Sequence, residues 1–266
     1  MSIQDWATEA RSSTEYQSPE KQRLIDVYQA LLENKLTPEE SAHGISTILE
    51  PLIKRNPDDV HIASVWGLFC GIVRHVGGDQ AASKRLIELL DYLAKIEVKD
   101  DHGNDLKYGA AKFWTNLPSF ALMFREYGIS IEPDDEMDIN DWVAQKTSYF
   151  NATSFAAMCL ANRPYMSGMA FYIKGNMSDA LVAEYETPEP RFRAALHIPA
   201  VSAWISIAGQ KIYQMCKEEA QGLSMEDWKS WEKGLDQVAE NDQVDEEMQN
   251  LALDVRDKMR NIQKGL

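Results

Sequence analysis

Apolar residues recur at helical spacing along nearly the whole chain, and the alternation typical of half-buried strands is almost absent. The last stretch is the clearest case, because a helix capped by Asp242 is expected to run almost to the end of the chain. Its large apolar residues step by three or four positions: Val244, Met248, Leu251, Val255, Met259 and Ile262. Such a stripe must pack on something, either the same chain or a partner protein.

Start and stop signals divide the remaining sequence into helices. N-caps are expected at four positions: Ser18, Thr37, Asp79 and Ser224. A proline follows the first of these caps, and the second opens a capping box with Glu40. A helix over 59–76 is expected to end at Gly77-Gly78, which makes a helical hairpin with the helix that follows.

The second half is organised around one long helix, expected from about Asp141 to Asn162. It is apolar almost all round, which is typical of a central, buried helix. Short helices are expected over 165–174 and 178–186. Because proline breaks helices, two helices are expected after Pro188, one over residues 190–196 and one over residues 199–220.

These patterns predict an all-α fold, an irregular multi-helix bundle of about nine to eleven helices with one central buried helix. No fixed period relates the hairpins, so a regular solenoid is not expected. Residues 1–17 are expected to form a tail or a short helix, and 18–266 a single helical domain. Within that domain, helical hairpins occupy 18–96 and a central and C-terminal bundle occupies 113–264.

Charge and composition narrow the class of protein. The 266 residues hold 42 acids and 27 bases, a net charge of −15 that opposes binding to nucleic acid or to anionic membranes. No apolar stretch reaches the length of a membrane span, and the first residues lack the pattern of a signal peptide. The three cysteines form no C-x-x-C pair and are typical of reduced core thiols. A cytoplasmic location is expected, with the nucleus also open.

One acidic string resembles a metal motif, D-D-x-x-D, at residues 134–138. It follows Pro133 in a loop and has no second metal motif, so a solvated acidic loop is expected instead. The five histidines show no zinc-binding spacing, and no nucleotide or dinucleotide motif is present. Neither a metal nor a cofactor is therefore expected. Asn176-Met177-Ser178 matches a glycosylation pattern and is interpreted as a chance match.

Polar and aromatic groups inside apolar helices are the candidate site. The candidate pocket comprises seven residues: Trp114, Asn116, Tyr149, Asn151, Phe155, Met166 and Trp204. Thr153 and Ser154 lie in the same apolar helix. Because buried polar groups must be hydrogen-bonded, these side chains either satisfy one another inside a core or line a pocket for an apolar small molecule.

Three short motifs carry a resemblance to a known family: Trp114-x-x-Leu117-Pro118, Asn151-x-x-x-Phe155-Ala156, and Ala200-x-x-x-Trp204-Ile205-x-x-Ala208-Gly209. Together they resemble the domain-of-unknown-function family numbered thirty-six thirty-two, which is found in filamentous ascomycetes. The likeness covers roughly residues 20–220. It implies a helical, intracellular fungal protein with no assigned activity, so no catalytic residue is carried over.

Two functions stay open, and whether the protein is an enzyme is undecided. The first is a non-catalytic interaction or adaptor protein, with a protein partner bound through the C-terminal helix. The second is a cofactor-independent cyclase or isomerase that acts on an apolar metabolite by positioning it in the helical core, which leaves a role in secondary metabolism open. A closed apolar cavity lined by Trp114, Asn151 and Trp204 would favour the second.

Overall fold

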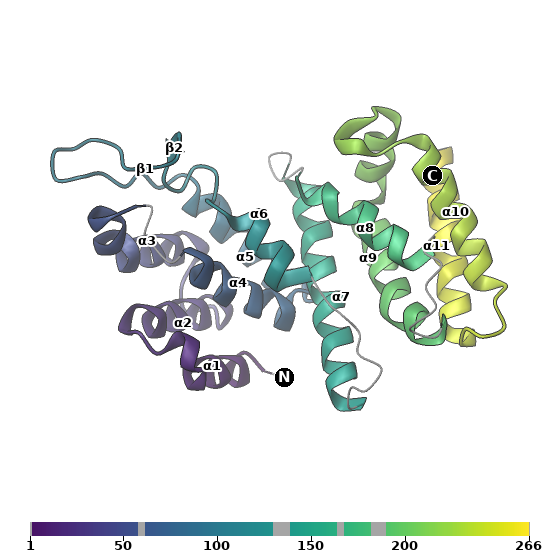
Figure 1. Ribbon diagram of the computed structural model, residues 1–266, viewed down its shortest axis with the longest axis horizontal. Helices are drawn as coiled ribbons and strands as arrows, with labels where there is room; N and C mark the ends of the chain where they lie inside the picture. Colours follow the sequence, from purple (N-terminus) through teal and green to yellow (C-terminus); the bar gives the residue numbers. More distant parts are fainter. Residues whose placement is uncertain (1, 58–61, 130–138, 164–167, 182–189, 266) are drawn as a thin grey trace. The chain divides into compact units, whose positions relative to one another are not determined.

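The computed structural model describes residues 2–57, 62–129, 139–163, 168–181 and 190–265. The chain divides into two compact units, Met1–Gly128 and Ile129–Leu266. The prediction of one helical domain over 18–266 stays a prediction. In the described ranges there are eleven α-helices and a single two-stranded hairpin (Figure 1), which confirms the all-α class and the irregular bundle.

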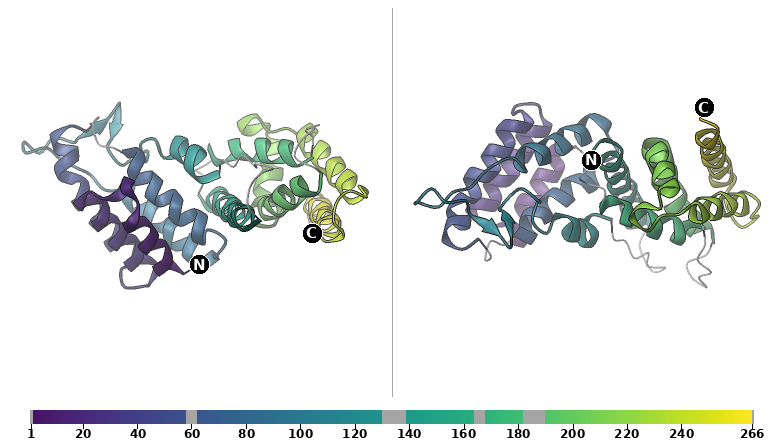
Figure 2. Two further views of the ribbon diagram at one scale, coloured as in Figure 1. Left: turned by 60° about the horizontal axis from the view of Figure 1, so that its bottom comes forward. Right: turned by 90° about the horizontal axis from the view of Figure 1, so that it is seen from above.

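The helices of the first unit pack both on neighbours in sequence and on helices further along the chain. Its helices are α1 (Ile3–Ser12), α2 (Pro19–Leu32), α3 (Pro38–Arg55), α4 (Ile62–Val76), α5 (Gln80–Leu93) and the short α6 (Phe120–Met123). Contacts join α1 to α2, α2 to α3 and α3 to α5, and Figure 2 shows these helices side by side. Between α5 and α6, β1 (Lys107–Tyr108) pairs antiparallel with β2 (Ala111–Lys112).

The expected N-caps of this unit are confirmed. The Ser18 hydroxyl accepts from the backbone N–H of Lys21 at 3.4 Å, and the Thr37 hydroxyl accepts from that of Glu40 at 3.1 Å. The Asp79 carboxylate caps α5 in the same way through Ala82. Each cap satisfies a donor that the first turn of a helix leaves unpaired, which explains why the helices start where they do.

The second unit is built around two long helices. Its helices are α7 (Ile139–Asn162), α8 (Ala170–Leu181), α9 (Pro190–Lys217), α10 (Met225–Ala239) and α11 (Glu246–Lys264). Nearly all side chains of α7 between Tyr149 and Leu160 are buried, as expected for the central helix. The other long helix, α9, packs on α7, α8, α10 and α11. Figure 1 shows α10 and α11 on the side of α9 that faces away from α7.

Three predicted boundaries in this unit are wrong. Where two short helices were expected over 165–174 and 178–186, the described residues form one helix, α8. Helix α9 runs straight through Pro199, which was expected to start a new helix. An interior proline costs about 3 kcal/mol, and the burial of Leu196, Ile198 and Val201 on either side of it offsets that cost.

The third correction concerns the start of the last helix. Asp245, not Asp242, occupies the N-cap position of α11. The backbone carbonyl of Asn241 accepts from the N–H of Val244 at 3.1 Å and from the side-chain amide of Gln249 at 2.6 Å. This turn occupies the segment in which the helix was expected to begin, so the helix starts later.

No helix among the described residues combines the length and apolarity needed to cross a membrane.

Candidate functional site

A chain of hydrogen bonds between three buried side chains and one half-buried side chain joins three helices of the second unit. The indole N–H of Trp204 on α9 donates to the Asn176 side-chain oxygen on α8 at 2.9 Å. The Asn176 side-chain nitrogen donates to the Tyr149 hydroxyl on α7 at 2.6 Å. That hydroxyl lies 3.3 Å from Nδ1 of His197, back on α9. We call these four side chains the α7–α9 network.

The directions of the two Asn176 bonds in the α7–α9 network follow from its first member, Trp204. An indole N–H can only donate, so the Asn176 oxygen must face Trp204 and its amide nitrogen must face Tyr149. Since the Tyr149 oxygen accepts from that amide, its own proton is left to donate to His197. With this proton donated to Nδ1, His197 is assigned as a neutral imidazole that carries its proton on Nε2.

Burial agrees with this assignment of protons. Desolvation, with a smaller contribution from Arg193, lowers the pKa of His197 from its ordinary 6.5 to about 4. Desolvation, followed by the charge of Asp179, raises the pKa of the Tyr149 hydroxyl above its ordinary value. At neutral pH both rings are uncharged, and the pKa values of both are moved away from 7, which disfavours general acid–base catalysis by either group.

Asp179 and Arg193 lie beside the network. The Arg193 Nε donates to the backbone carbonyl of Asp179 at 2.5 Å, which ties the start of α9 to α8. Desolvation raises the pKa of the half-buried Asp179 carboxyl, against the opposing effect of the Arg193 charge. The two helices that carry Asn176 and His197 are therefore joined at a second point.

The structure brings two of the predicted site residues together, Tyr149 and Trp204, through Asn176. Asn151 and Phe155 are buried on the same helix as Tyr149, and each has an interaction partner. Met166 lies outside the described residues. The grouping of all seven residues into one pocket stays a prediction.

Trp114 and Asn116 belong to the first unit. Trp114 is fully buried, and its indole N–H donates to the Ser46 hydroxyl at 3.2 Å. Its ring packs edge-on against Phe113 and Trp66. Asn116 is exposed.

Sequence reasoning missed Asn176 and His197 as members of the network. Asn176 was singled out only for its glycosylation pattern, and His197 only as an unsuitable metal ligand. A signal for Asn176 was present, because it lies among the apolar residues of α8 and is itself 8% exposed. The signal used for Asn151, an amide in an apolar helix, would have found it.

Two buried hydroxyls on α7, those of Thr153 and Ser154, differ from the network in their hydrogen bonding. Among the residues that the structure describes, neither Thr153 Oγ1 nor Ser154 Oγ has a hydrogen-bond partner, although the two residues are 0% and 3% exposed. An unpaired buried hydroxyl costs about 1–3 kcal/mol. The α7–α9 network thus follows the first of the two expected arrangements, bonding inside the protein, whereas for Thr153 and Ser154 both arrangements stay predictions.

The cysteines are free and buried, as expected of core thiols. Burial raises the pKa of the Cys70 and Cys216 thiols to about 12, which keeps them protonated and weakly nucleophilic at neutral pH. Among the residues with described positions, no group of three His, Cys, Asp or Glu side chains is placed to hold a metal. The acidic string at 134–138 lies outside those residues.

The family described as "Protein of unknown function (DUF3632)" matches residues 66–235, a segment that contains all four residues of the α7–α9 network. No curated protein matches the chain, and no solved structure does.

Proposed function

The chain belongs to the family described as "Protein of unknown function (DUF3632)", and we propose that it is a non-catalytic helical interaction protein of the adaptor type. The observation that carries the proposal is the α7–α9 network. In it the Trp204 N–H donates to Asn176, the Asn176 amide donates to Tyr149, and the Tyr149 hydroxyl contacts His197. Polar groups committed in this way hold helices in register.

The proposed protein partner binds through the C-terminal helix. The apolar face of α11 is covered by α9 and α10, so the face available to a partner is the outward, charged one. That face exposes Glu246, Glu247 and Asp254. A partner with a basic surface would complement it.

A charge reversal tests this partner. Asp254→Lys should weaken the complex between the purified chain and its purified partner, and added salt should weaken the wild-type complex, because exposed charges are screened. Glu9→Lys is the matched control, since Glu9 is an exposed helical acid of the first unit. Equal loss in both variants, or no loss in either, would contradict binding through α11. A calorimetric titration provides the measurement.

A second candidate function is favoured by Thr153 and Ser154. Buried hydroxyls without a partner in the described part of the chain are groups to which an apolar metabolite with one polar atom would hydrogen-bond. This observation supports a cofactor-independent enzyme of the cyclase or isomerase type.

Native mass spectrometry of the full chain separates the two functions. If the protein is a non-catalytic interaction protein, the variants Thr153→Val and Ser154→Ala should melt at or above the wild-type temperature, because each removes an unpaired hydroxyl. Neither variant should change the small molecules that the chain retains. A retained molecule that is lost in both variants would overturn the proposal in favour of the enzyme.

A further inference from the structure

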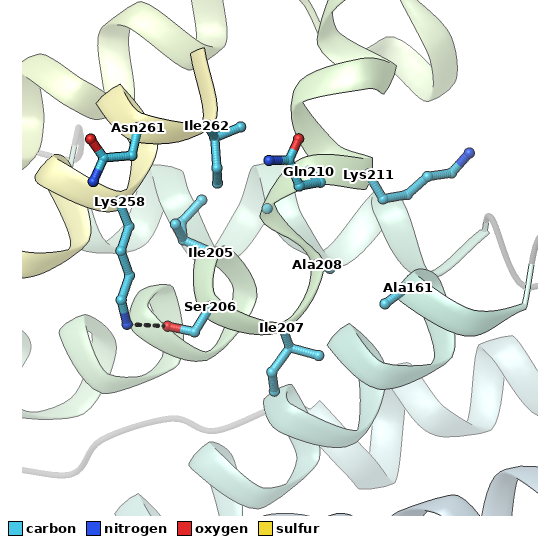
Figure 3. A pocket seen from close by; sticks show the side chains of 11 residues that line it. Ala161, Ile205, Ser206, Ile207, Ala208, Gln210, Lys211, Lys258, Asn261 and Ile262 are labelled. Atoms are coloured by element: carbon cyan, nitrogen blue, oxygen red, sulfur yellow. Dashed lines mark hydrogen bonds between the residues drawn. The ribbon is translucent and has the colours of Figure 1, made fainter. Parts of the chain in front are cut away.

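A groove opens beside α9, between the end of α7 and the last turns of α11 (Figure 3). Its volume is about 500 Å³, within the range of small-molecule sites. Apolar side chains, among them Ala161 and Ile262, form much of its surface. The polar remainder comes from lysine, serine and amide side chains, and none of the described residues that line it is acidic.

The apolar part of the groove is formed where α11 approaches α9 closely. A Cβ atom on Gly209 would come within 2.6 Å of Cδ1 of Ile262, so glycine is what lets this isoleucine lie directly against the α9 backbone. The result is an apolar wall where α11 crosses α9, with Ala161 at the end of α7 on the other side.

A cation lies at the edge of this wall. Figure 3 shows Lys258 reaching from α11 to α9, where its ammonium donates to the Ser206 hydroxyl at 2.9 Å. That bond uses one of three N–H donors, and two remain for a ligand. Within the described residues, Lys258 has no ion pair, whereas Arg256 and Arg260 on the same helix pair with Asp236 and Glu232.

The charge of the groove is positive, opposite to the net charge of the whole molecule. Lys211, which also lines the groove and points away from Lys258 in Figure 3, has no ion pair among the described residues either. Two lysines that have no ion pair among the described residues therefore flank an apolar groove in a chain of net charge −15. A groove of this composition favours an anion with an apolar tail over a neutral or cationic ligand.

We propose that the groove binds a small amphipathic carboxylate. The carboxylate accepts hydrogen bonds from the Lys258 ammonium, beside Ser206, and the hydrocarbon chain lies against Ile262 and Ala161. A carboxylate offers only acceptors and so matches the donors that Lys258 has left. This binding site is separate from the α7–α9 network and does not depend on the proposed partner.

Calorimetric titration of the full chain with decanoate tests the proposal. Decanoate should bind once per chain and more weakly as sodium chloride is raised. Decyltrimethylammonium, which has the same chain length and the opposite charge, should not bind. Lys258→Met should weaken decanoate binding about tenfold, the loss of one charge-assisted hydrogen bond. Lys229→Met, at an exposed lysine of α10 outside the groove, should leave binding unchanged.

A second variant tests the apolar part of the site. Ala161→Phe places a ring in the groove from an exposed position, so it should abolish decanoate binding without changing the circular dichroism spectrum. Equal affinity for the anionic and cationic ligands would overturn the proposal. So would an absence of decanoate binding, or unchanged binding in both Lys258→Met and Ala161→Phe.

Discussion

At the scale of single residues, Asn176 is the centre of the buried polar structure, because both ends of its amide are used. Asn176→Leu leaves the Trp204 N–H without its acceptor and removes the donor to Tyr149. We expect the free energy of unfolding to fall by about 2 kcal/mol or more, since buried donors left unpaired bear their full desolvation cost. Urea unfolding measures the change.

The control for this prediction is Asn250→Leu, at an exposed asparagine of α11. It should alter stability by no more than about 0.5 kcal/mol. Equal effects of the two substitutions would mean that the amide of Asn176 contributes nothing specific.

His197 makes stability depend on pH. Its pKa is about 4 in the folded protein and 6.5 ordinarily, because burial, and then Arg193, disfavour the imidazolium. Between these values the unfolded chain binds a proton that the folded chain does not, so stability falls as the pH is lowered through this window. The expected loss is about 3 kcal/mol, complete below pH 4.

His197→Gln tests this pH dependence while keeping an acceptor for Tyr149. Its free energy of unfolding should change less between pH 6.5 and 4 than that of the wild type. His43→Gln, at an exposed histidine, should follow the wild-type curve. If both variants keep the wild-type curve, His197 does not titrate as argued.

Among the helices, two glycines allow the effect of close packing to be distinguished from the effect of helix propensity. A Cβ atom on Gly234 of α10 would lie 2.6 Å from the Cβ of Leu181 and 2.9 Å from its carbonyl oxygen, whereas one on Gly175 of α8 would meet nothing within 4 Å. Gly234→Ala should therefore lower the free energy of unfolding by about 1–3 kcal/mol, because the backbone at Leu181 must move to make room for the added methyl group. Gly175→Ala should stabilise by about 0.5–1 kcal/mol.

Thermal melts of the two glycine variants provide the measurement. Stabilisation by Gly234→Ala would show that α8 and α10 do not approach as closely as described.

Helix α11 is bound to its unit by both apolar and charged contacts. Met248, Ala252, Val255 and Met259 are buried. Arg256 pairs with Asp236 at 2.7 Å and Arg260 with Glu232 at 2.6 Å. Deleting residues 241–266 uncovers the faces of α9 and α10 that the helix covers, so we expect a molten or insoluble product. Near-ultraviolet circular dichroism and dye binding would detect it.

A truncated chain that stays folded and monomeric would contradict this prediction. It would mark α11 as an element that can leave its unit to bind a partner.

At the scale of the whole molecule, charge is the dominant property. A net charge of −15 repels the phosphate backbone, so we expect no complex with DNA or RNA in gel-shift assays at physiological salt. A complex that weakens steeply with salt would refute this expectation.

The helical class, the burial of α7 and the family could all be predicted from the amino-acid sequence. So could the starts of the helices capped by Ser18, Thr37 and Ser224. These features depend on residues within about one helical turn of each other, or on the periodicity of a single helix, and such local signals are readable without a fold.

Which polar side chains meet depends on how distant segments of the chain pack together. Tyr149 lies 27 positions from Asn176 and 48 from His197, and no local pattern relates such positions. The continuity of α9 through Pro199 was decided in the same way, since burial against neighbouring helices outweighs a local preference to break. Contacts between distant segments are formed by packing, and packing energies exceed the propensities that a single sequence displays.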